Sequence, residues 1–320
     1  VLYNQGTCLN ELNLQDKATV IYKKILKLEP NFIEAKWNLA FIQLMQGNYT
    51  EGWLNHETRK IREKTKKDYT NIIESKKWSG EKKLTNKIIY ILNEQGLGDY
   101  IQFCRYFPML ENLGAKIILN TPDPLKKIIK TLNVDYNHIN NIEKLEYDYN
   151  CYLMSLPLAF NTKINTIPNK TPYLFAPKDK KDYWIKKLGF KLTKRVGIMW
   201  SGNPKNENDH NRSMQLKNLI NLLETPFEFH SLQIDYNKFD LKLMNKFKNL
   251  INHKDEIKGF DNTAGLIESM DLIISVDTSV AHLSGALNKP IWLMLPFTPD
   301  FRWLLNRNDS PWYPSMKLYR

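Results

Sequence analysis

The residues with the clearest chemical potential are Asp277, Thr278, Ser279 and His282, which lie where an apolar run passes into a helical pattern. The first turn of a helix leaves several backbone N–H groups unpaired and carries about half a positive charge, so it favours a phosphate. Thr278 and Ser279 lie about one helical turn before His282, which places the three side chains on one face. Hydroxyls, amides and an imidazole would then converge on one anion, such as a diphosphate. The spacing allows equally that Asp277 or Thr278 only caps the helix and that His282 belongs to the core.

A second candidate is the turn at Gly98 and Asp99, which follows a β-rich run at 87–93 and opens a helical stretch. Glycine at such a turn lets a ligand approach the backbone closely, although the run lacks the complete G-x-G-x-x-G pattern of a dinucleotide site. Asp99 would lie at the carboxyl end of the first strand, where a general base would face a ligand. The bare pattern favours an ordinary helix cap, so both roles remain open.

A third candidate follows the strand expected at 196–200, where Trp200 and Ser201 lead into a polar loop that ends near Arg212. A loop without apolar anchors at the carboxyl end of a strand is a typical ligand site. Arg212 could bind a phosphate through two parallel hydrogen bonds, or it could be an ordinary surface arginine. The tail at 296–314 holds further residues that either stack on a base or sugar or simply dock the tail: Arg302, Trp303, Trp312 and Tyr313.

Alternating strands and helices must position these residues. Short apolar runs predict strands at 87–93, 115–120, 149–154, 196–200, 227–232, 272–276 and 290–295. Helical patterns lie between most of these runs, which is typical of βα units on a parallel sheet. A linker near 176–194 separates two such series, so the sequence predicts an α/β fold with two Rossmann-like domains. Ligands of these sheets bind beyond the carboxyl ends of the strands, so we expect the site in a cleft between the domains.

An internal repeat precedes the α/β series. The run Tyr3-Asn4-Gln5-Gly6 aligns with Trp37-Asn38-Leu39-Ala40. This offset has the 34-residue period of the tetratricopeptide repeat, a helix–turn–helix unit. Two such units cannot bury their own faces, so we expect them to cap a longer array or to lean on the next domain. The predicted domains are therefore helical repeats at 1–62, a charged connector at 63–86, and Rossmann-like domains at 87–178 and 179–320.

Composition limits the classes of function. The chain of 320 residues has a formal net charge of +12, which either marks an anionic partner or reflects solvated lysine runs. No basic and aromatic stripe accompanies the charge, so nucleic acid is not an expected partner. Three separated cysteines and scattered histidines indicate neither a disulfide framework nor a protein-bound metal, and no apolar run has the length of a membrane span. These features predict a cytoplasmic protein with reduced thiols.

Taken together, the motifs resemble those of the heptosyltransferase-like family 9 glycosyltransferases, in the bacterial form that carries tetratricopeptide repeats in front. The resemblance covers nearly the whole chain and is carried by Gly98-Asp99, by residues 197–204 and 211–213, and above all by residues 277–283. It implies a GT-B fold whose C-terminal domain binds a nucleotide-diphosphate sugar. It also implies inverting transfer that needs no metal and no other cofactor.

The resemblance assigns roles to individual residues. Asp99 matches the family's catalytic aspartate, which would deprotonate the acceptor hydroxyl as its oxygen attacks the anomeric carbon. The implied donor site comprises Gly98, Trp200, Ser201, Arg212, Asp277, Thr278, Ser279 and His282. The acceptor would be a glycan, a lipid or a protein, and the repeats could recruit a protein partner.

Two other functions fit the same sequence. The repeats and a short N-terminal domain could form a non-catalytic interaction protein on a degenerate glycosyltransferase scaffold. A GT-B-like epimerase would instead convert the nucleotide sugar without an acceptor. Stabilisation by nucleotide diphosphates would separate the scaffold from both enzymes.

Overall fold

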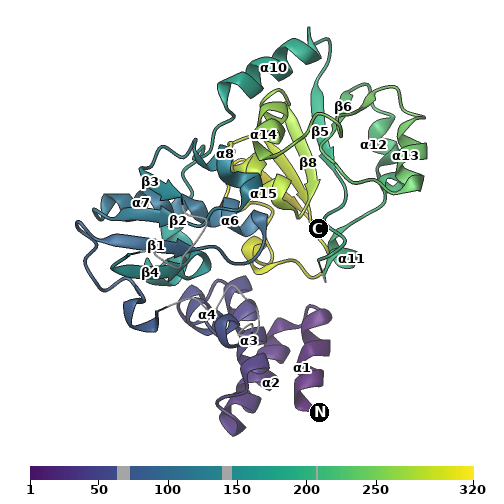
Figure 1. Cartoon of the computed structure of the whole chain (residues 1–320). Helices are drawn as coiled ribbons and strands as arrows, with labels where there is room; N and C mark the ends of the chain where they lie inside the picture. The colour runs from purple at the N-terminus through teal and green to yellow at the C-terminus, as the bar shows by residue number, and fades with distance from the viewer. Residues whose placement is uncertain (63–72, 139–145, 207) are drawn as a thin grey trace.

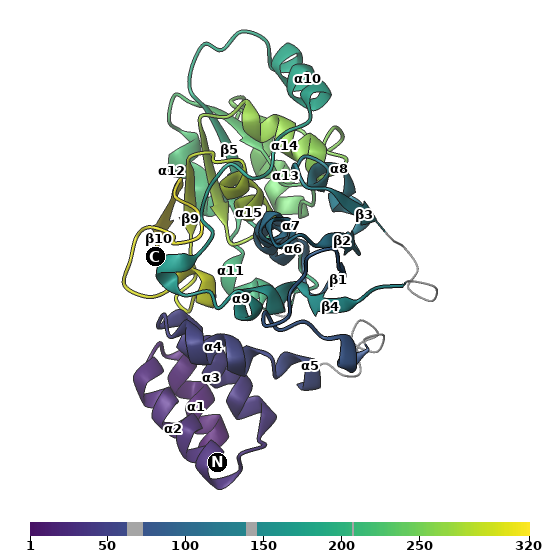
Figure 2. The same ribbon diagram turned by 90° about the vertical axis from the view of Figure 1, so that its left-hand side faces the viewer.

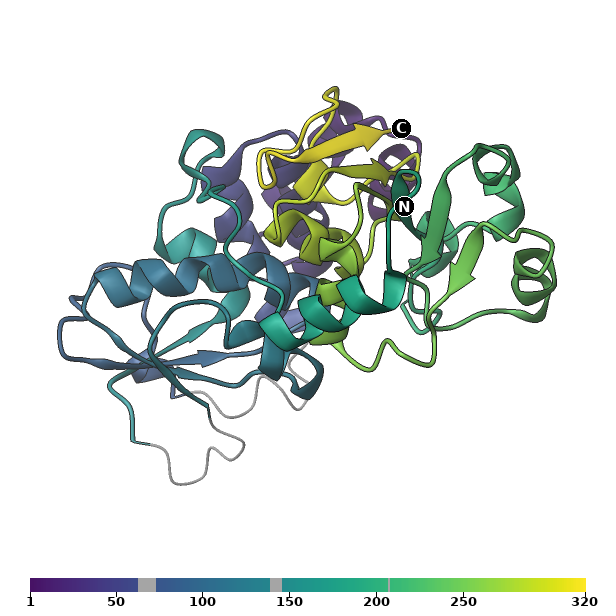
Figure 3. The ribbon, with the colours of Figure 1, turned by 90° about the horizontal axis from the view of Figure 1, so that it is seen from above.

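The computed structural model describes residues 1–62, 73–138, 146–206 and 208–320. These residues form two parallel sheets with their helices and a set of N-terminal helices, which confirms the predicted α/β class (Figure 1). The N-terminal lobe, in blue, lies beside the C-terminal lobe, in green and yellow, when the protein is seen from above (Figure 3). The helical segment, in purple, lies below both lobes (Figure 2).

The N-terminal lobe is built on a four-stranded parallel sheet with the order β3-β2-β1-β4. Its strands are β1 (Ile88–Leu92), β2 (Lys116–Leu119), β3 (Tyr136–His138) and β4 (Tyr149–Tyr152). Its helices are α6 (Leu97–Phe103), α7 (Phe107–Asn112), α8 (Lys126–Ile129) and α9 (Leu156–Ala159). The central strand β1 is continuously apolar because both of its faces are buried. The strand order reverses between β1 and β4, which makes the carboxyl end of β1 a topological switch point.

The C-terminal lobe is built on a six-stranded parallel sheet with the order β10-β9-β8-β5-β6-β7. Its strands are β5 (Arg195–Met199), β6 (Glu228–Ser231), β7 (Leu250–Asn252), β8 (Leu272–Val276), β9 (Ile291–Met294) and β10 (Met316–Tyr319). Its helices are α10 (Lys178–Leu188), α11 (Asp209–Arg212), α12 (Ile220–Leu223), α13 (Lys238–Met244), α14 (Phe260–Glu268) and α15 (Ser279–Ala286). The order reverses between β5 and β8, so a second switch point lies at the start of α15.

The N-terminal segment is helical, as the repeat pattern predicts. It contains α1 (Leu2–Glu11), α2 (Gln15–Leu28), α3 (Ile33–Met45), α4 (Tyr49–His56) and the short α5 (Arg59–Arg62). Helix α1 packs against α2 and α3 packs against α4, which gives two helical hairpins. Their assignment to the tetratricopeptide family stays a prediction.

The helical segment packs against both lobes. The ring of Trp53 in α4 lies 6.3 Å from that of Phe103 in the N-terminal lobe and 5.7 Å from that of Phe301 in the C-terminal lobe. All three side chains belong to one continuous apolar core. The described part of the predicted connector also packs on the N-terminal lobe, because Trp78 is buried with its ring 5.5 Å from that of Phe160. The first ten residues of that connector after Arg62 lie outside the described residues.

Among the described residues, no helix combines the length and the apolar character that crossing a membrane requires.

Candidate active site

The two helices that follow the switch points begin side by side. Helix α6 packs against α15, and Gly98 lies at their contact. A Cβ atom at Gly98 would lie 3.0 Å from His282 Cδ2 and 3.5 Å from Ser279 Cα. A side chain at this position would therefore press on His282, and glycine allows the two helices to pack closely. The first turns of the helices that follow β1 and β8 therefore meet at this point.

Asp99 lies in the first turn of α6 and has two partners. Its Oδ2 accepts a hydrogen bond of 2.8 Å from the backbone N–H of Gly96, so it does cap the helix. Its Oδ1 pairs with the guanidinium of Arg302 from the C-terminal lobe. About a fifth of the side chain, 21%, remains exposed. Burial raises the pKa of the Asp99 carboxyl above its usual value, although the charge of Arg302 opposes this rise. The cap therefore occupies one carboxylate oxygen, and Arg302 occupies the other.

The segment from β8 to α15 offers the backbone groups that the sequence predicts. Thr278 is the N-cap of α15, but its side chain makes no capping hydrogen bond. Within the part of the chain that the structure describes, the N–H groups of Ser279 and Val280 donate no hydrogen bond. Asp277 precedes this turn, and its Oδ2 accepts a hydrogen bond of 2.7 Å from the indole N–H of Trp303. The start of α15 therefore presents unpaired amide donors beside a carboxylate.

His282 faces this turn from within α15. Its Nδ1 lies 2.9 Å from the hydroxyl oxygen of Tyr313, and its ring stacks on that of Trp303 with the centroids 5.4 Å apart. Its Nε2 lies 3.9 Å from Asp277 Oδ1. The histidine is thus packed in the core, as one interpretation of the sequence predicts, while one nitrogen points toward the candidate site.

The positive charges of three arginines act on His282: Arg302, Arg105 of the N-terminal lobe and Arg212 of the C-terminal lobe. Burial and then the positive charges of these guanidiniums hold the pKa of His282 well below its usual value. Arg212 Nη1 donates a hydrogen bond of 3.0 Å to the carbonyl oxygen of Asp277, which brings its positive charge to the end of β8. Such a concentration of positive charge at a helix N-terminus favours an anion.

The structure places the other predicted donor residues differently. The indole of Trp200 is buried in the core of the C-terminal lobe, and its N–H donates a hydrogen bond of 2.9 Å to Asp240 Oδ2. The relative exposure of Trp200 is 0%, so its indole offers no surface to a ligand. Ser201 is partly exposed, and its backbone N–H donates to the side chain of Gln233. At Trp200, therefore, the backbone at the strand end can face a donor, but the indole cannot.

The tail residues separate into two groups. Trp303, Trp312 and Tyr313 are buried in the shared core, so their main role is to dock the tail rather than to stack on a sugar or base. Arg302, next to Trp303, reaches across to Asp99 instead. The sequence shows Arg302 as one basic residue of an irregular tail, and no local pattern reveals its partner.

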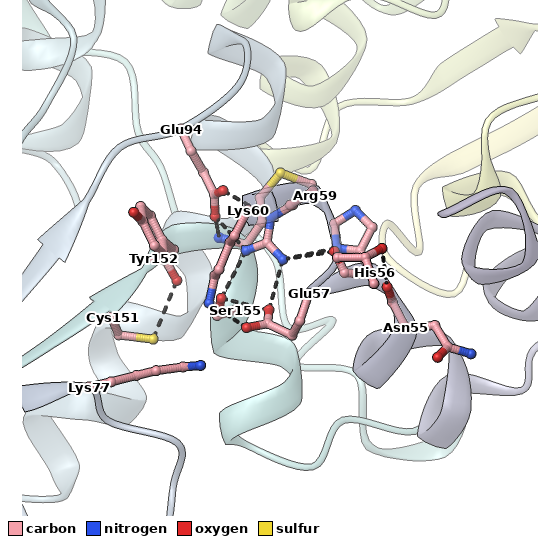
Figure 4. A network of polar contacts seen from close by, with 12 residues as sticks. Asn55, His56, Glu57, Arg59, Lys60, Lys77, Glu94, Cys151, Tyr152 and Ser155 are labelled. Carbon is pink, nitrogen blue, oxygen red and sulfur yellow. Dashed lines mark hydrogen bonds and ion pairs between the residues drawn. The ribbon is translucent and has the colours of Figure 1, made fainter. Parts of the chain in front are cut away.

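A buried ionic network lies behind the candidate site at the carboxyl end of β1 (Figure 4). Arg59 of α5 donates to both carboxylate oxygens of Glu94, at 2.9 Å and 2.8 Å, and neither side chain has any exposed surface. Arg59 also bonds to Glu57 and to the hydroxyl of Ser155. Glu94 accepts a further hydrogen bond from the backbone N–H of Met154. This network joins the helical segment to the strand that leads to Asp99.

The stability of the protein is expected to depend on pH through Asp277. Burial, and then the charge of Asp300, raises the pKa of the Asp277 carboxyl to about 6. Because this value lies above that of an unfolded aspartate, the folded protein binds the proton more tightly, and the stabilisation is lost as the pH rises from about 4 through 6. Asp277→Asn should therefore gain stability relative to the wild type over this range, by on the order of 2 kcal/mol. Urea unfolding midpoints at pH 4 to 8 measure the difference, and a difference that does not vary with pH would contradict the assignment.

Comparison with known proteins adds a fold relationship. No family model matches the chain. Protein FlbA of Caulobacter vibrioides is 24% identical over 315 residues, which cover 88% of this chain and 50% of FlbA. The chain thus spans about half the length of the curated relative that it matches.

Two solved structures are similar to the lobes. The family 9 glycosyl transferase of Veillonella parvula is 10% identical, covers 74% of this chain and 88% of its own, and superimposes with a TM-score of 0.54. The ADP-heptose LPS heptosyltransferase II of E. coli is 14% identical over 73% of this chain and 90% of its own, with a TM-score of 0.49. The similarity to the Veillonella structure shows that the two sheets and their helices form a GT-B-like fold.

Proposed function

We propose that this protein is a glycosyltransferase that moves a sugar from a nucleotide-diphosphate sugar to an acceptor hydroxyl. The observation that carries the proposal is the contact between the first turn of α6, which holds Asp99, and the start of α15 at the switch points of the two sheets. The α15 amides and the nearby arginines suit a diphosphate, and the Asp99 carboxylate suits a proton acceptor. The GT-B-like fold shared with the Veillonella glycosyl transferase supports the same reaction class.

In the proposed reaction, the acceptor O–H loses its proton to Asp99 while its oxygen forms a bond to the anomeric carbon of the sugar. The bond between that carbon and the diphosphate oxygen breaks, and its electron pair leaves with the nucleotide diphosphate. Negative charge therefore grows on the diphosphate in the transition state. Arg212 and the N–H groups of Ser279 and Val280 are fixed donors that would stabilise this charge.

The finer features of the reaction are also part of the proposal. Attack by the acceptor from the face opposite the leaving diphosphate inverts the anomeric centre, and arginines with helix amides take the place of a metal ion. The acceptor is a glycan, a lipid or a protein. The helical segment contributes to acceptor recognition, because it packs against both lobes near Phe301 and Phe103.

The test is a panel of UDP-, GDP-, ADP- and CDP-sugars, with release of the nucleotide diphosphate measured for each. We expect one nucleotide class to raise the melting temperature of the protein and to give hydrolysis or transfer. Product analysis with and without an acceptor separates a transferase from an epimerase. If no nucleotide diphosphate stabilises the protein and no donor is turned over, the chain is the non-catalytic scaffold instead.

A further inference from the structure

Arg302 belongs to the C-terminal lobe, but its guanidinium lies among residues of the N-terminal lobe. Its Nη2 donates to Asp99 and its Nε donates to Gln102, and both of these residues lie in α6. Its Nη1 donates to Asp300 at 2.7 Å. The side chain is only 8% exposed, so this arrangement is a built contact rather than a surface ion pair. Arg302 thus holds the candidate base from the opposite lobe.

The residue next to Arg302 contacts the segment that leads into α15. The indole of the next residue, Trp303, donates to Asp277, which precedes the N-cap of that helix. The positive charge of Arg302 also acts on both His282 and Asp277. The charge of Arg302 therefore acts both on the candidate base and on the residues beside the place where the diphosphate would bind.

The Asp99 carboxylate and a diphosphate bound at α15 would compete for the guanidinium of Arg302. The carboxylates of Asp99 and Asp300 already pair with its guanidinium, and the charge of Asp277 also attracts it. A diphosphate would add further negative charge. Three of the five N–H groups of Arg302 donate to Gln102, Asp300 and Asp99 in the contacts described above. A diphosphate at α15 would offer a stronger bidentate partner than a single carboxylate oxygen.

We propose that Arg302 is a positioning residue that couples donor binding to the release of the base: the diphosphate draws the guanidinium away from Asp99, whose carboxylate then accepts the acceptor's proton. This inference rests on the proposed function. Under this proposal Asp99 becomes available as a base only after the donor has bound. The donor therefore binds before the acceptor reacts.

The proposal predicts an increase in affinity from a substitution at the base. Asp99→Asn removes the charge that competes for Arg302, so the nucleotide diphosphate should bind about 5-fold or more tightly. Arg302→Ala should weaken binding, and the double variant should bind like Arg302→Ala alone, because the gain requires the guanidinium. Isothermal titration calorimetry with UDP, GDP, ADP and CDP measures each dissociation constant. Asp309→Asn removes an exposed carboxylate that pairs with the nearby Arg307, and it should leave the affinity unchanged.

The outcomes separate this inference from the proposed function. Wild-type protein that binds none of the four nucleotides would overturn both. Wild-type protein that binds one of them, while Asp99→Asn binds equally or more weakly, would overturn the coupling and leave the donor site standing. If Arg302→Ala fails to fold, Arg302→Gln in the Asp99→Asn background provides the same comparison, since glutamine removes the positive charge and keeps part of the side-chain volume.

Discussion

Asparagine at position 99 is expected to lower the rate of sugar transfer by about 10²- to 10⁴-fold, the usual contribution of a general base. The amide keeps the size of the aspartate, and its oxygen can still accept the hydrogen bond from Gly96. It cannot take up a proton, so the loss should appear in kcat. Initial rates with the donor found by the panel measure the effect, and circular dichroism checks that the fold is retained.

The pH dependence of the rate provides a second measurement of the same role. Burial raises the pKa of Asp99, so the carboxylate is a stronger proton acceptor than a fully exposed aspartate. The wild-type rate should fall as the pH drops through this raised pKa, and Asp99→Asn should lack that part of the profile. Asp309→Asn, an exposed carboxylate of the tail, serves as the matched control. Transfer by Asp99→Asn at the wild-type rate would reduce Asp99 to a helix cap.

The sequence predicts the parts of the fold that have strong local patterns. The strands β1, β5 and β8 can be predicted from sequence because both faces of a buried parallel strand are apolar, which gives a continuous apolar run. Three strands were not predicted, namely β3, β7 and β10. Two of them have only three residues, YNH and LIN, and β10 alternates buried and exposed side chains. Such short or half-exposed strands are formed by pairing with a neighbour rather than by their own sequence.

Some residues of the candidate site can likewise be predicted from local sequence, and others cannot. Asp99 and Thr278 could be found from sequence because each follows a strand and opens a helix. Arg302 is separated from Asp99 by 203 residues, so only the packing of the two lobes brings them together. Trp200 shows the opposite error, since a position at a strand end predicted a ligand contact although its indole fills the core. A strand end locates the backbone, but the direction of a side chain alternates along the strand.

Methionine at position 59 is expected to destabilise the protein by about 3–5 kcal/mol, the usual cost of removing one partner of a buried ion pair. Glu94 would keep its hydrogen bond from Met154 but would lose the guanidinium that holds both of its oxygens. Its charge would then be buried without the guanidinium that pairs with it. Urea unfolding midpoints compare this variant with the wild type. Glu74→Gln is the control, because Glu74 is 82% exposed and pairs with Lys77 at 3.6 Å, so its loss should cost about 1 kcal/mol or less.

A second substitution tests whether the destabilisation comes from the buried charge of Glu94. Arg59→Met combined with Glu94→Gln removes both charges, and it should recover part of the stability that Arg59→Met loses. The double variant should also unfold in one transition, because Trp53 of the helical segment shares its core with both lobes. A separate early transition for the helices, with the lobes unaffected, would show that the segment is an independent module. In that case the network at the end of β1 would tether the segment without supporting the strand that carries Asp99.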